Sequence, residues 1–77
     1  MARALLNDYH GAVDDYSQSF RLKPRDPNVL VSRGVVRAKL GDRPGAAEDF
    51  QNALALAPPD WPQRGTVQTL LNRVRGR

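Results

Sequence analysis

The chain has 77 residues, of which 40% are hydrophobic and 26% charged, with a formal net charge of +4 and no cysteine. This length holds one small domain, and the sequence excludes a disulfide, a thiolate metal site and any apolar run near the ~20 residues that span a bilayer. The charge is uneven, because residues 1–61 hold eight basic and eight acidic side chains, and the excess comes from Arg64, Arg73, Arg75 and Arg77.

The N-terminal third predicts one helix preceded by a short segment. Its apolar residues recur at helical spacing and are Ala12, Val13, Tyr16 and Phe20. We expect a helix over residues 9–22, capped by Asp8 and ended by Pro24. Residues 1–7 match the end of a preceding helix, which indicates that the chain continues a longer array or has an unusually short cap.

A second helix is expected over residues 27–40. Asp26 is placed to cap it, and Pro27 suits its first position because a helix leaves that backbone N–H unpaired. Gly34 costs a helix about 1 kcal/mol relative to alanine, so its presence predicts close approach of a neighbouring helix. Gly41 ends the helix where a left-handed backbone is least costly.

A third helix is expected over residues 43–57, with Asp42 as its cap and Pro44 in its first turn. Its expected buried residues are Ala46, Phe50, Ala53 and Leu54. Pro58 ends it.

The last helix is expected to begin near Asp60 and Pro62 and to end near Arg75. Its apolar stripe consists of Val67, Leu70, Leu71 and Val74. The opposite face is polar and is expected to stay in water, at Gln63, Arg64, Gln68, Asn72 and Arg73. Trp61 is expected to cover the end of the core. One apolar and one polar face are typical of the capping helix of a repeat array.

An internal repeat links these segments. A shift of 34 residues aligns eight identical pairs within 21 positions, where chance gives about one or two. The first members of these pairs are Leu6, Asp8, Gly11, Ala12, Asp15, Leu22, Pro24 and Asp26. A period of this length is typical of stacked helical hairpins.

The repeat resembles the tetratricopeptide repeat family. The residues that carry the resemblance are Gly34, Gly41, Asp42, Ala46, Phe50, Ala53 and Pro58. It implies an all-α fold in which antiparallel helical hairpins stack as a short α-solenoid with a C-terminal capping helix. Residues 1–26 would form a partial first repeat, residues 27–60 a complete repeat, and residues 61–77 the capping helix.

The resemblance also implies a protein–protein interaction module with a concave groove for a peptide or a partner helix. The groove residues that it implies are Asn28, Val31, Val35, Ala38 and Lys39. Because Val31 and Val35 cannot hold a carboxylate, we expect an apolar or mixed peptide rather than a free carboxylate terminus.

The first helix of the complete repeat departs from the family pattern in three places. Leu30 replaces the preferred tryptophan, and Arg33 and Arg37 replace apolar residues. A buried arginine needs a carboxylate, so we expect one of these arginines to pair with Asp15 and the other with Asp49. The alternative is that both lie along the surface with only their stems packed.

No constellation of side chains points to catalysis. His10 is the only histidine, and no cysteine accompanies it, so no usual zinc site is expected. Asp14 and Asp15 are adjacent and diverge by about 100° on a helix, so they cannot share a proton. We therefore expect no enzymatic activity, cofactor or metal.

Two other functions remain open beside the interaction module. The arginine-rich last helix could contact an anionic surface or nucleic acid, although the neutral remainder of the chain disfavours it. Alternatively, the chain could self-associate, since an incomplete first repeat would leave a flank that includes Val13 and Phe20 open. In that case we expect a homodimer whose melting temperature rises with concentration, which sedimentation and melting across a hundredfold dilution would detect. The sequence does not identify a compartment.

Overall fold

The structure is a computed structural model that describes residues 9–24 and 26–76. Its regular elements are the helices α2 (Tyr9–Leu22), α3 (Pro27–Lys39), α4 (Arg43–Leu56) and α5 (Arg64–Gly76). No strand occurs in these residues, so the predicted all-α class is confirmed. None of the described helices is both long and apolar enough to cross a bilayer.

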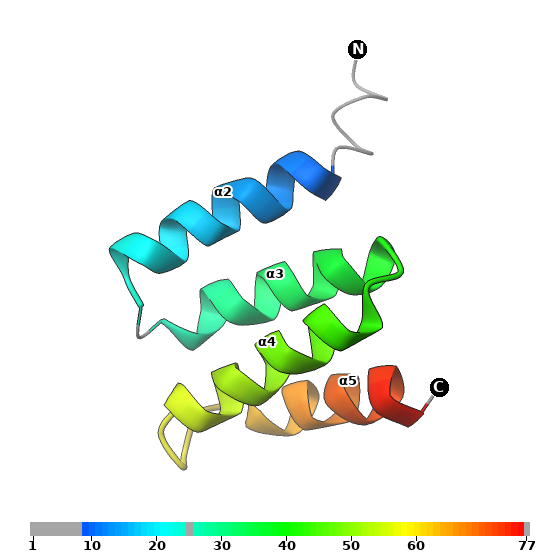
Figure 1. The fold of residues 1–77 in the computed structure, drawn as a ribbon. Coiled ribbons are helices and arrows are strands. Elements are labelled where there is room, and N and C mark those ends of the chain that lie inside the picture. Colours follow the sequence, from blue (N-terminus) through cyan, green and yellow to red (C-terminus); the bar gives the residue numbers. More distant parts are fainter. Residues whose placement is uncertain (1–8, 25, 77) are drawn as a thin grey trace.

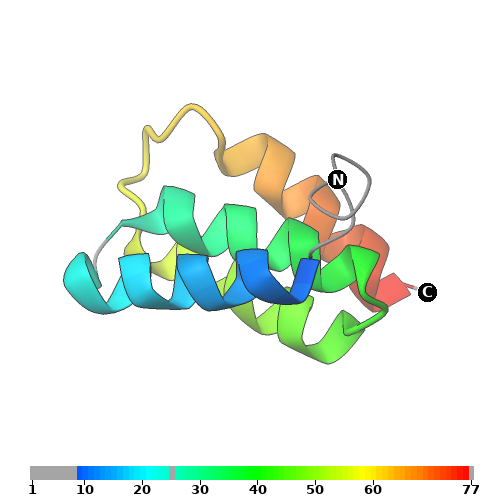
Figure 2. The ribbon, with the colours of Figure 1, turned by 90° about the horizontal axis from the view of Figure 1, so that it is seen from above.

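Each helix packs mainly on the next helix along the chain. The principal contacts are between α2 and α3, α3 and α4, and α4 and α5. Figure 1 shows the chain reversing its direction at each connection. Seen from above, α2 and α3 run side by side, whereas α5 crosses them at an angle after a connection that swings outward (Figure 2). The central helices α3 and α4 are therefore covered on two sides.

The helix ends follow from the capping residues. The Asp26 carboxylate accepts a hydrogen bond from the Asn28 N–H at 3.0 Å, and the Asp42 carboxylate accepts one from the Gly45 N–H at 3.0 Å. Gly41 has a φ of 86°, so the predicted left-handed residue after α3 is confirmed. The expected cap Asp8 lies outside the described residues.

The last helix begins later than predicted. The Arg64 N–H donates to the Trp61 carbonyl at 3.1 Å, and the first α-type bond joins the Val67 N–H to the Gln63 carbonyl at 2.9 Å. Pro62 therefore lies in a turn before α5, because no helical bond forms until one turn further along the chain.

The core lies among α3, α4 and α5. Its buried hydrophobic residues are Leu30, Ala46, Phe50, Ala53, Ala57, Trp61, Val67 and Leu71. Trp61 belongs to this cluster, whereas Leu54, which was predicted to be buried, is half-buried and packs against it. Helix α2 contributes no buried residue, since among the described helices it packs mainly on α3.

Gly34 allows α3 and α4 to approach closely. A Cβ atom added to Gly34 would lie 2.7 Å from Cε1 of Phe50, and the Phe50 side chain is itself only 1% exposed. Real Cβ contacts are not this short, so any side chain here would push the ring out of place. The predicted reason for this glycine is confirmed.

Gly34→Ala tests this packing, with Gly65→Ala as a matched control in another helix. We expect Gly34→Ala to lower the free energy of unfolding by about 1–2 kcal/mol, because overpacking outweighs the gain in helix propensity. Gly65 has no atom within 4 Å of its added Cβ, so Gly65→Ala should raise stability by about 0.5 kcal/mol. Urea denaturation followed by circular dichroism measures both. Stabilisation by both substitutions would contradict the close approach.

Candidate interaction site

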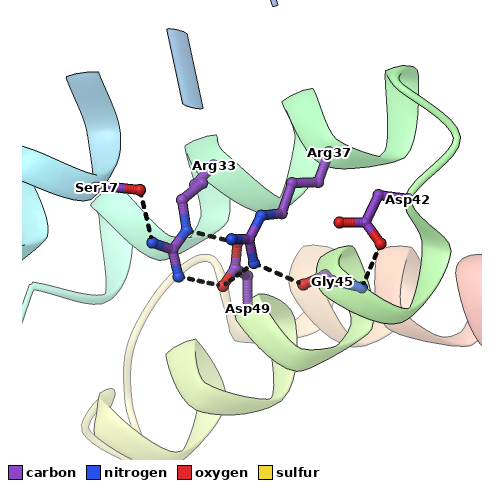
Figure 3. A network of polar contacts seen from close by, with 6 residues as sticks. All are labelled: Ser17, Arg33, Arg37, Asp42, Gly45 and Asp49. Carbon is purple, nitrogen blue, oxygen red and sulfur yellow. Dashed lines mark hydrogen bonds and ion pairs between the residues drawn. The ribbon is translucent and has the colours of Figure 1, made fainter. Parts of the chain in front are cut away.

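A buried carboxylate holds two arginines of α3. Asp49 in α4 is 0% exposed. Arg33 donates to it through two nitrogens, from Nε to Oδ2 at 2.9 Å and from Nη2 to Oδ1 at 2.7 Å. Arg37 donates from Nη1 to Oδ1 at 3.3 Å and to the Gly45 carbonyl at 3.4 Å (Figure 3). The bidentate geometry of Arg33 is the stronger of the two pairings.

The Arg33 guanidinium also reaches α2. Its Nη1 donates to the Ser17 hydroxyl at 3.0 Å, and its Cζ lies 5.9 Å from the centre of the Phe20 ring. Its hydrogen bond to Asp49 raises the pKa of Arg33, and burial opposes this effect only in part. Arg33 therefore stays charged and joins α2, α3 and α4.

The predicted division of the arginines between two carboxylates is wrong. Both arginines converge on Asp49, whereas Asp15 is exposed on α2. Residues two positions apart on a helix diverge by about 200°, so Asp15 points away when Ser17 faces α3. Phe20 lies three positions after Ser17 on the same face, and it packs on the core rather than on an open flank. The spacing of Ser17 and Phe20, three positions apart, is the signal in the sequence that these two residues share the face of α2 that meets α3.

An open groove lies between the C-terminal parts of α3 and α5. Its volume is about 230 Å³. Helix α3 contributes one wall, with Val35, Ala38 and Lys39. Helix α5 contributes the other wall, with Leu70, Arg73 and Val74. The buried ring of Phe50 from α4 completes the lining, so the surface inside the groove is mainly apolar.

The expected groove residues divide between this hollow and its surroundings. Val35, Ala38 and Lys39 line it. Asn28 is exposed and Val31 is half-buried, and neither belongs to the lining. Sequence reasoning missed the wall from α5, where Leu70 and Val74 of the predicted apolar stripe are half-buried and line the groove.

Arg64 is half-buried, contrary to the prediction that it stays in water on the polar face of the last helix. Its Nη2 donates to three carbonyl oxygens at the end of α4, those of Leu54 at 3.2 Å, Ala57 at 2.9 Å and Pro58 at 3.1 Å. The Leu54 carbonyl lies in the last turn of α4, where carbonyls lack a partner within the helix and a cation is favoured. The Ala57 and Pro58 carbonyls follow the helix, and the Pro58 carbonyl also accepts a hydrogen bond from the Trp61 N–H at 3.0 Å. The side chain thus ties the start of α5 to the end of α4.

His10 and Asp14 line a second hollow of about 440 Å³ beside Arg37 and Asp42. Within residues 9–24 and 26–76, no group of three or more histidine or acidic side chains could hold a metal ion. The apolar groove is the candidate site.

Comparison of the chain with protein-family models, with curated proteins and with solved structures finds no match.

Asp49→Asn tests the buried network, with Asp15→Asn as the matched control. We expect Asp49→Asn to lower the free energy of unfolding by about 2–4 kcal/mol, because two partly buried guanidinium groups lose their counter-charge. Asp15→Asn should change it by less than about 0.5 kcal/mol, since the residue is exposed. Equal effects of the two substitutions in urea denaturation would contradict this account.

Proposed function

We propose that the chain is a protein–protein interaction module, similar to a tetratricopeptide repeat scaffold, that binds a peptide segment or a partner helix. The observation that carries this proposal is the apolar groove between α3 and α5. Its lining is more apolar than the linings of two other hollows of the described residues, one beside His10 and Asp42 and one beside Ser19 and Val29.

The size of the groove favours a side chain of a partner over a free small molecule. Small-molecule sites measure about 300–1,000 Å³ and enclose most of the ligand. This groove measures about 230 Å³ and is open to solvent. It therefore suits one bulky apolar side chain that anchors a longer segment, as in helix-in-groove recognition.

The helix arrangement supports the same proposal. Helices that each pack mainly on their chain neighbours are compatible with stacked hairpins and with a short α-solenoid. The 34-residue repeat relates Tyr16 to Phe50, and the tight Gly34–Phe50 contact occurs where the resemblance expects small and aromatic residues to meet. In such a scaffold, neighbouring helices supply the walls of a binding groove.

The alternative, nucleic-acid binding through the C-terminal arginines, has less support. Arg64 donates to backbone carbonyls, and Arg73 lines the groove, which leaves Arg75 as an exposed arginine of α5 away from the groove. A phosphate-tracking surface needs several free cations in a row. A steep fall of affinity with salt would favour this alternative, whereas weak salt dependence favours the groove.

Amide-shift mapping tests the groove. The probe is a degenerate pool of nonapeptides with a central phenylalanine or leucine, prepared once as C-terminal amides and once as free acids. We expect the amide pool to shift signals from Val35, Ala38, Leu70 and Val74, and the free acids to give no large additional effect. Shifts confined to other helices, or a large preference for the free acid, would overturn the proposal.

Leu70→Gln and Leu22→Gln provide the matched variants. Leu70 lines the groove, whereas Leu22 is 83% exposed on α2. Loss of binding is expected for the first variant alone, since only it makes the groove polar. Equal loss in both variants would indicate general hydrophobic adhesion.

A further inference from the structure

We propose that the groove selects acidic apolar segments, in which a bulky apolar anchor is flanked by side-chain carboxylates. This inference rests on the proposed function and names the chemistry of its partner. Lys39 on the α3 wall and Arg73 on the α5 wall place one cation on each side of the apolar lining.

These two cations have no carboxylate partner within the part of the chain that the structure describes. Both are exposed, and neither pairs with a carboxylate of the described residues. By contrast, Arg33 and Arg37 on the same helix share Asp49. Helices α3 and α5 contain no acidic residue between Pro27 and Lys39 or between Arg64 and Gly76, so every charged side chain on the two walls is positive.

The positions of Lys39 and Arg73 explain why the groove should favour carboxylates attached to an apolar segment over a free anion. Lys39 and Arg73 lie in the last turns of α3 and α5, where the backbone carbonyls carry partial negative charge. The backbone therefore repels an anion, and attraction comes only from the two side chains. An apolar anchor in the groove would supply the affinity and hold the flanking carboxylates near Lys39 and Arg73. The same two cations would repel basic segments and so exclude them.

Competitive capture on the immobilised chain tests the inference. Four pools of N-acetylated, C-amidated nonapeptides compete at about 0.1 M salt, which leaves nearby charges partly unscreened. Three pools carry a central phenylalanine or leucine flanked by glutamate, by glutamine or by lysine. The fourth carries the glutamates with serine in place of the apolar residue. We expect the acidic apolar pool to be retained about tenfold over the glutamine pool.

Variants assign this preference to the two cations. Lys39→Glu with Arg73→Glu should reverse the preference toward the lysine pool, and Lys39→Gln with Arg73→Gln should abolish it. Arg43→Glu with Arg75→Glu is the control, because it makes the same change in net charge at exposed residues outside the groove lining. Thermal melting checks that each variant folds.

The outcomes separate the two proposals. Equal retention of the glutamate and glutamine pools would overturn the inference and leave the proposed function standing. Equal retention of the acidic pools with and without the apolar anchor would overturn the inference in favour of simple charge attraction. Loss of the preference for the acidic apolar pool in the variant Arg43→Glu with Arg75→Glu would overturn it in the same way. Retention of no pool would overturn the proposed function and the inference with it.

Discussion

The buried carboxylate of Asp49 is the constraint on which the arrangement of the helices depends. A charge that is fully removed from water is strongly unfavourable unless counter-charges and hydrogen bonds replace its hydration. Arg33 and Arg37 provide them from α3, which fixes the position of α3 along α4. Because Arg33 also contacts Ser17, the same carboxylate indirectly positions α2.

This constraint acts on one side of α3, and another part of α3 lines the groove. Gly34, next to Arg33 in sequence, meets the Phe50 ring, and Phe50 follows Asp49 in α4. Adjacent residues on both helices therefore combine an ion pair with a close apolar contact. The ring completes the lining of the groove, so the network that orders α3 also holds the groove in shape.

Most of the helices and caps could be predicted from the sequence because they depend on local signals. The predicted limits of α2 agree with the structure, and Asp26, Asp42 and Gly41 act at the expected helix ends. Contacts between helices depend on how each helix is rotated about its axis, which spacing alone does not give.

Three features depend on helix rotation or crossing and therefore could not be predicted from residue spacing. The sequence assigned Asp15 to an arginine, whereas the rotation of α2 presents Ser17 instead. Arg64 has a polar side chain and was expected in water, but the turn before α5 brings it to the end of α4. The wall that α5 adds to the groove depends on its crossing angle, which no local pattern encodes.

A double-mutant cycle between Arg33 and Asp49 tests the central claim most directly. The cycle compares the free energies of unfolding of Arg33→Leu, Asp49→Leu and the double variant. Arg33→Leu alone is expected to lower the free energy of unfolding by about 1–3 kcal/mol. If the buried pair fixes α3 on α4, the double variant should be more stable than the sum of the single effects predicts, with a coupling energy of about 2 kcal/mol. Additive effects within about 0.5 kcal/mol would contradict this account.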